Sequence, residues 1–144
     1  MDHVAIMKPS WKLLRKIVNG EKKIESRWYK TRREAWGKVK TGDIIWFKDS
    51  GQPVTVRAKA GRVLEFSDLT PEKVRRIIYQ YGCKDCIALS RLEYFCQWAK
   101  NKKYCVLVFL ETPQPVARPF KINKRGFGMS RAWLTIKDIA TIKK

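Results

Sequence analysis

The chain has 144 residues, 44% of them hydrophobic, and it carries 32 Lys and Arg against 13 Asp and Glu, a formal net charge of +19. That apolar content excludes wholesale disorder, and the length predicts one domain, residues 1–144, able to bury a core without disulfides or metals. No apolar run approaches the roughly 20 residues of a spanning helix, and the N-terminus lacks a secretory signal, so we expect a cytoplasmic protein.

The first part of the chain predicts a strand, a helix and a second strand. Residues 4–7 form an apolar strand, and a helix follows that starts at Pro9 and stops at Gly20. The apolar stripe of this helix has four residues at helical spacing, Trp11, Leu14, Ile17 and Val18. Residues 23–29 form the next strand.

The remainder of the chain predicts further strands and two more helices. We expect strands at residues 44–47, 54–66 (one long strand or two shorter ones), 104–110, 116–122 and 132–136, and helices from Thr70 to near Gly82 and from near Lys84 to Lys100. The last helix has its apolar stripe at Leu89, Leu92, Phe95, Cys96 and Ala99. Strands at both ends with helices between them indicate an α+β fold. The expected core of that fold is a small mixed β-barrel or curled sheet of about five to seven strands, with three or so flanking helices.

One segment carries a recognisable pattern. Residues 20–27 read G-x-K-x-x-E-x-R, after a predicted strand and helix, and a Gly42-Asp43 pair followed by an apolar strand comes next. In this order of features the chain resembles the ASCH family from about Val4 to Leu110. The resemblance implies a PUA-like β-barrel that binds nucleic acid, with RNA as the expected ligand.

The chemistry of the motif can be argued from its spacing. Strand alternation puts Glu25 and Arg27 on one face, where an ion pair can hold both side chains. Gly20 permits a sharp turn, after which Lys22 is expected at the rim of the sheet as a mobile charge. In a cleft Arg27 would offer phosphate a planar fork, and Glu25 would accept hydrogen bonds from an exocyclic amine of a base. The alternative is a structural ion pair with Lys22 in solvent.

Two cationic stretches interleaved with aromatic residues, at residues 22–40 and 118–131, predict contacts with a nucleic acid. A polyanionic partner relieves the self-repulsion of such a charge, and aromatic rings can stack on bases. The alternatives are an anionic membrane surface, a solvated surface without a partner, and a protein-interaction or ribosome-associated module whose charge reflects its surroundings. We expect a monomer. The expected nucleic-acid-binding residues are Lys8, Lys22, Glu25, Arg27, Trp28, Lys30, Arg32, Arg33, Lys40, Lys121, Lys124, Arg125 and Phe127. Trp11 and Trp46 are expected in the core, and Trp28 and Phe127 at the surface.

Most enzyme classes find no support in the sequence. The single histidine, His3, suggests no nucleophile system, and neither a phosphate-binding glycine loop nor a metalloprotease motif is present. The resemblance leaves one enzymatic alternative, because some small ASCH proteins are acetylcytidine amidohydrolases that use a Lys, a Thr and a Glu. Lys22 matches the lysine, Glu25 stands at the Thr position, and only Asp85 and Glu93 suggest themselves as the distal carboxylate. A hydrolase acting on a modified nucleoside or on RNA, with Lys22 and Glu25 catalytic, is therefore the alternative function.

The four cysteines leave three possibilities open. Cys83 and Cys86 have C-x-x-C spacing, which can serve zinc, a disulfide or redox chemistry, or no special role. A zinc site would need Cys96 and Cys105 as well, but these are expected to be buried on a helix and a strand. We expect no metal and no cofactor.

Overall fold

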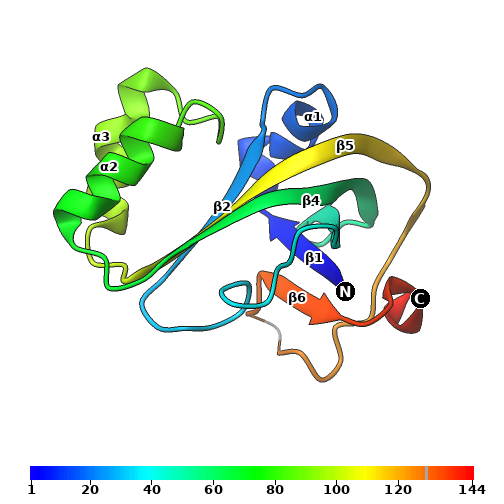
Figure 1. Cartoon of the computed structure of the whole chain (residues 1–144). Coiled ribbons are helices and arrows are strands. Elements are labelled where there is room, and N and C mark those ends of the chain that lie inside the picture. The colour runs from blue at the N-terminus through cyan, green and yellow to red at the C-terminus, as the bar shows by residue number, and fades with distance from the viewer. Residues whose placement is uncertain (129) are drawn as a thin grey trace.

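A computed structural model describes residues 1–128 and 130–144 of the chain (Figure 1). Its six strands form one mixed sheet in the order β2-β5-β4-β3-β1-β6, in which only β1 and β3 are parallel neighbours. The strands are β1 (Asp2–Met7), β2 (Ile24–Tyr29), β3 (Ile44–Asp49), β4 (Val54–Phe66), β5 (Tyr104–Phe120) and β6 (Trp133–Ile136). The helices are α1 (Leu13–Val18), α2 (Pro71–Tyr81) and α3 (Leu92–Ala99), with short 3-10 turns at Pro9–Trp11, Leu89–Arg91 and Ile139–Ile142.

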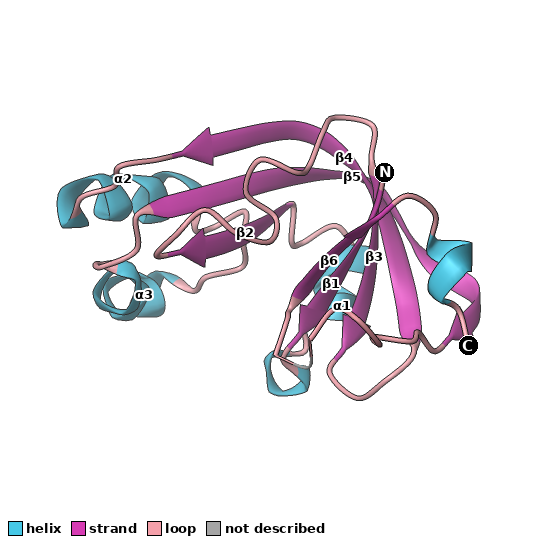
Figure 2. Cartoon of the chain, turned by 90° about the horizontal axis from the view of Figure 1, so that it is seen from below, coloured by secondary structure: helices cyan, strands magenta, loops and turns pink. Residues whose placement is uncertain are grey.

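The sheet is strongly curled, because its two longest strands, β4 and β5, bend. β4 and β5 pair with three shifts of register, which mark β-bulges, and bulges increase local bending and twist. Figure 2 shows the result: β2 runs alongside one end of β4 and β5, while β1, β3 and β6 fan out around their other end. The expected α+β fold with a curled mixed sheet and three helices is confirmed.

Three clusters of buried side chains hold this arrangement. The first fills the inside of the curl, where Ile17 of α1 packs with Phe47 and Trp133. The second joins α2 and α3 to the β2 end of the sheet. The third lies beside β6 and includes Leu134. Trp46 is half-buried and packs against this cluster, so its predicted core position is only half right.

The first predicted helix is interrupted, which corrects the position of Trp11. The 3-10 turn Pro9–Trp11 ends at Lys12, whose φ of 53° is left-handed, and α1 starts afresh at Leu13. The interruption removes Trp11 from the helical register of Leu14 and Ile17. As a result Trp11 is 50% exposed, and the prediction that it belongs to the core is wrong. Val18, also expected in the stripe, is 37% exposed.

The last predicted helix is shorter than expected. It was expected from near Lys84, but α3 starts at Leu92, because Cys86 has a left-handed φ of 62° that a helix cannot contain. Leu89, expected in the apolar stripe, is 83% exposed. Residues 83–86 form a turn closed by a hydrogen bond from Cys86 N to Cys83 O. That turn carries Asp85 toward β2.

The separate strand expected at 116–122 does not exist, because β5 continues through it to Phe120. β2 pairs with β5 only between Tyr104 and Phe109, so one side of the later part of β5 has no strand beside it. Prolines are tolerated on such an edge, where no ladder hydrogen bond is lost. The prolines at 113, 115 and 119 therefore fit a continuous strand.

No helix among the described residues has the length and apolar character that crossing a membrane requires.

The single histidine, His3, is a buried residue of β1 that takes part in a hydrogen-bond network. His3 is fully buried, and its Nδ1 lies 3.2 Å from Trp133 Nε1 and its Nε2 lies 2.8 Å from Asp43 Oδ2. Because an indole N–H only donates, Nδ1 accepts from Trp133 and the proton on Nε2 is donated to Asp43. Burial lowers the pKa of His3 below its ordinary value, although Asp43 opposes this.

We expect folding stability to fall as the pH is lowered below about 6.5, because unfolded His3 then binds a proton that the folded state resists. Urea unfolding at several pH values between about 7.5 and 5.5 measures this effect. A His3→Gln variant should be less stable at neutral pH but should lose less stability across that interval. An equal loss in both proteins would show that another group is responsible.

Candidate nucleic-acid-binding site

A pocket of about 550 Å³ opens beside β2, at the edge of the sheet. One wall consists of the end of β1, the Pro9–Trp11 turn and α1, and the opposite wall consists of the turn after α2 and the inner side of α3. β2 itself forms the floor. The lining includes five aromatic residues, Trp11, Trp28, Tyr29, Phe95 and Trp98. A volume of this size suits a ligand as large as a nucleotide.

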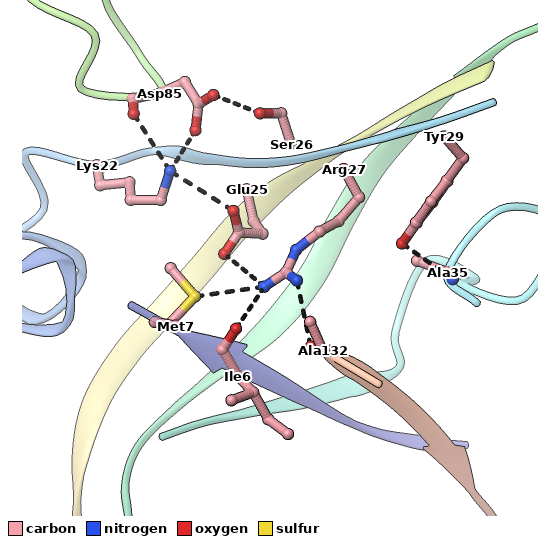
Figure 3. A network of polar contacts seen from close by, with 10 residues as sticks. All are labelled: Ile6, Met7, Lys22, Glu25, Ser26, Arg27, Tyr29, Ala35, Asp85 and Ala132. Atoms are coloured by element: carbon pink, nitrogen blue, oxygen red, sulfur yellow. Dashed lines mark hydrogen bonds and ion pairs between the residues drawn. The ribbon is translucent and has the colours of Figure 1, made fainter. Parts of the chain in front are cut away.

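The floor carries an alternating chain of charges (Figure 3). Lys22 Nζ donates to the carboxylate of Asp85 and to the Asp85 main-chain oxygen at 3.2 Å, and it lies 3.8 Å from Glu25 Oε1. Glu25 Oε2 lies 3.6 Å from Arg27 Nη2. The Ser26 hydroxyl donates to the other carboxylate oxygen of Asp85. Two acids therefore balance two bases, and the floor has no net charge.

Lys22 is a buried residue, which corrects its predicted place. Only 2% of it is exposed, so the prediction of a mobile charge at the rim is wrong. The chain does turn sharply at Gly20 (φ 83°), but Lys22 then points inward, because Asp85 meets it there from the turn before α3. A contact between residues 63 positions apart has no signature in the local sequence.

The charge states of the floor follow from burial and mutual attraction. Burial disfavours the Lys22 ammonium, but the Asp85 and Glu25 carboxylates outweigh it and hold the pKa of Lys22 above its ordinary value. Burial, with the nearby Glu25, raises the pKa of Asp85 against the pull of Lys22. Lys22 is thus a firmly held cation at neutral pH and not a ready base.

Arg27 ties the two edges of the curled sheet together. From β2 its Nη1 donates to Ala132 O, just before β6, at 3.2 Å, and its Nη2 lies 3.4 Å from Ile6 O of β1. The guanidinium also stacks 5.3 Å from the centre of the Trp133 ring. The predicted ion pair between Glu25 and Arg27 is present. The donors expected to face phosphate, however, are directed at the main chain.

Glu25 has an oxygen without a hydrogen-bond partner among the described residues. Glu25 is 5% exposed and lines the pocket, and its Oε2 accepts no hydrogen bond, although Arg27 lies at ion-pair distance. A buried carboxylate oxygen without a donor is costly. A donor from a bound molecule would remove that cost.

Several solved structures have a similar fold. The crystal structure of the ASCH protein from Zymomonas mobilis superimposes with a TM-score of 0.68 at 15% identity, covering 99% of this chain and 96% of that chain. A mutant of the same protein superimposes with a TM-score of 0.67 at 18% identity, covering 97% of this chain and 93% of that chain. This chain has an ASCH-domain fold. The N-terminal domain of Staphylothermus marinus McrB is more distant, with a TM-score of 0.53 at 11% identity over 94% and 87%. No family model and no curated protein matches the sequence.

Within this ASCH fold, five of the predicted residues line the pocket and the others lie elsewhere. Those at the pocket are Lys8, Lys22, Glu25, Arg27 and Trp28. Lys8 is exposed at the mouth, 5.2 Å from the centre of the Trp11 ring, and Trp28 is half-buried against the second cluster. The expectation that Trp28 lies at the surface is therefore only half right.

Apart from Lys22, Glu25, Arg27 and Trp28, the predicted binding residues of the two cationic stretches do not line the pocket. Lys30, Arg32, Arg33 and Lys40 are exposed outside it, with Arg32 stacked 5.1 Å from the Trp36 ring. Lys121 and Arg125 are exposed and Lys124 is half-buried at the far end of β5 and beyond, away from α2 and α3 (Figure 1). Phe127 is half-buried against the third cluster, so its expected surface position is, like that of Trp28, only half right.

Several pocket residues escaped the sequence analysis. Of the two candidate carboxylates, Asp85 belongs to the floor, whereas Glu93 pairs with Arg75 on the helices. Lys16 and Arg91 line the mouth, and Trp98 is 51% exposed beside them. Trp98 lies outside the predicted apolar stripe of this helix, and a large aromatic residue at such a position is the signal that could have been used.

The cysteines offer no metal site among the described residues. All four are free thiols, and the predicted burial of Cys96 and Cys105 is confirmed in the second cluster. Cys83 is exposed, while Cys86 is half-buried at the pocket, where burial raises its thiol pKa.

Proposed function

We propose that this chain is an RNA-binding domain whose pocket beside β2 receives one unpaired nucleotide. The observation that carries the proposal is the pocket itself, walled by aromatic rings, in a chain of net charge +19. Aromatic walls stack on bases, and a long-range positive potential attracts the phosphate backbone. Lys8, Lys16 and Arg91 at the mouth stand where the phosphates of a bound strand would pass. The domain extent, the monomeric state and the cytoplasmic location remain predictions.

Salt titration tests the electrostatic part of this proposal. Each phosphate contacted by a single strand adds about 0.7 to the slope of log affinity against log salt. Contact with about four phosphates would thus weaken binding roughly 50-fold between about 50 and about 200 mM salt. Fluorescence anisotropy with a short single-stranded RNA and a hairpin measures this. Absence of binding at low salt, or binding insensitive to salt, would contradict the proposal.

A matched pair of variants tests whether the pocket is the binding site. Trp98 of α3 lines the pocket, whereas Tyr79 of α2 does not, yet the two are 51% and 53% exposed and each has a cation over its ring. Trp98→Ala should weaken RNA binding by about 5- to 150-fold, since stacking contributes about 1–3 kcal/mol per base. Tyr79→Ala should leave binding nearly unchanged. Equal effects of both would show that the pocket is not used.

A hydrolase of a modified nucleoside is the second candidate. It is favoured by Asp85, which stands beside Lys22 where the resemblance calls for a distal carboxylate. In that reaction water would cleave acetylcytidine to cytidine and acetate. The firmly charged Lys22 is a poor base, which weighs against the reaction. Assays of acetylcytidine and RNA turnover by the wild-type protein test this candidate. If neither acetate release nor RNA cleavage is detected, the hydrolase function is excluded.

A further inference from the structure

The pocket floor differs from its mouth in what it can bind. Its cations are already engaged, because Lys22 donates to Asp85 and Arg27 donates to the main chain of Ala132 and Ile6. The carboxylates of Glu25 and Asp85 offset the positive charges of Lys22 and Arg27. A phosphate placed there would meet few available donors and two acids, so the floor is a poor site for an anion.

The floor is a good site for a hydrogen-bond donor. Glu25 lines the pocket, and its buried Oε2 lacks a hydrogen-bond partner among the residues the structure describes. A carboxylate only accepts, so the group that satisfies it must carry N–H or O–H. The aromatic lining favours a flat ring in the same space.

The cations available for phosphate lie at the mouth. Lys8 and Arg91 are exposed and Lys16 is half-buried, and each of them lines the pocket. No ion pair is recorded for any of the three among the described residues. The pocket therefore has an accepting floor, aromatic walls and a cationic mouth.

We propose that a nucleotide enters base first, with its phosphate at the mouth, and that Glu25 selects bases presenting an exocyclic amino group. This inference rests on the proposed function and specifies how the same site is occupied. Adenine, cytosine and guanine present such a group. Uracil has a carbonyl oxygen where cytosine has its amino group, and hypoxanthine has one where adenine has its amino group, and the Glu25 carboxylate repels such an oxygen. Compared with guanine, hypoxanthine simply lacks the amino group. Only an unpaired base can reach the floor, since pairing would occupy the amino group.

Binding of nucleoside monophosphates to the wild-type protein tests the selection. CMP should bind at least about tenfold more tightly than UMP, and AMP and GMP at least about tenfold more tightly than IMP, because hydrogen bonds to charged groups are the stronger class. Glu25→Gln should reduce each ratio to near one, while Glu21→Gln, an exposed acid four residues earlier, should leave it unchanged. Should Glu25→Gln fail to fold, the wild-type ratios decide alone.

A second arm tests the orientation. Cytidine, which has no phosphate, should still bind, and inorganic phosphate at matched ionic strength should not displace it. Displacement by phosphate, or equal affinity for CMP and UMP, would overturn the inference and leave the proposed function standing. Salt-dependent binding of RNA without binding of any mononucleotide would also overturn the inference and leave the proposed function standing. Failure of RNA to bind at all would overturn the proposed function itself.

Discussion

Replacing Lys22 by Met is expected to lower the free energy of unfolding by about 3–5 kcal/mol, because it leaves the Asp85 and Glu25 carboxylates buried together without their shared cation. The loss should grow as pH rises. Without Lys22 the pKa of folded Asp85 rises further above its unfolded value, so the stability of the variant is greatest in acid and falls as Asp85 is forced to ionise. Urea unfolding at several pH values measures both effects.

Two comparisons make the Lys22 result specific. Lys23→Met changes the neighbouring, exposed lysine and should shift stability by no more than about 0.5 kcal/mol. Combining Lys22→Met with Asp85→Asn should cost less than the sum of the single changes, because the second removes a charge that the first left unpaired. Additive losses, or a loss below about 1 kcal/mol for Lys22→Met, would mean that the buried pair contributes little.

Replacing Arg27 by Met is expected to cost about 2–4 kcal/mol, because the guanidinium joins the two edges of the curled sheet. The change removes donors to Ala132 O and Ile6 O and takes one cation from Glu25. Arg27→Lys should fall between wild type and Arg27→Met, since an ammonium keeps the charge but lacks the planar fork that reaches both carbonyls.

Hydrogen exchange locates the damage that the Arg27 variants cause. Amides of β6 and of the neighbouring part of β1 should exchange faster in Arg27→Met, while those of α2 and α3 should keep their protection. Arg118→Met, at an exposed arginine of β5, is the control and should leave the pattern unchanged. A uniform increase in amide exchange rates throughout the protein would show that Arg27 does not act at the junction of the two edges of the sheet.

The fold was predictable where local patterns and packing agree. The alternation in β2 correctly placed Glu25 and Arg27 on one face, and Thr70 starts α2 as its sequence indicates, with its side chain accepting a hydrogen bond from Lys73 N. The predicted helix boundaries were wrong where the φ angle of a single residue interrupts the helix. Left-handed Lys12 and Cys86 carry ordinary side chains, and nothing in the apolar spacing around them shows that a helix stops there.

The candidate site was predictable only in part, because it is assembled from distant segments. The motif residues lie at the pocket, yet the partners that settle their roles come from elsewhere: Asp85 for Lys22, and the main chain at Ala132 for Arg27. A count of charges likewise says nothing about where they gather. Most of the basic side chains lie outside the pocket, although their summed field still attracts a polyanion.

Chemical-shift mapping with a short single-stranded RNA shows whether one base of the strand occupies the pocket beside β2. The indole N–H signals of Trp11, Trp28 and Trp98 and the amides of residues 83–88 should shift together at low salt, and these shifts should diminish as the salt concentration is raised. Shifts confined to residues 118–128, with the pocket signals unmoved, would contradict the account.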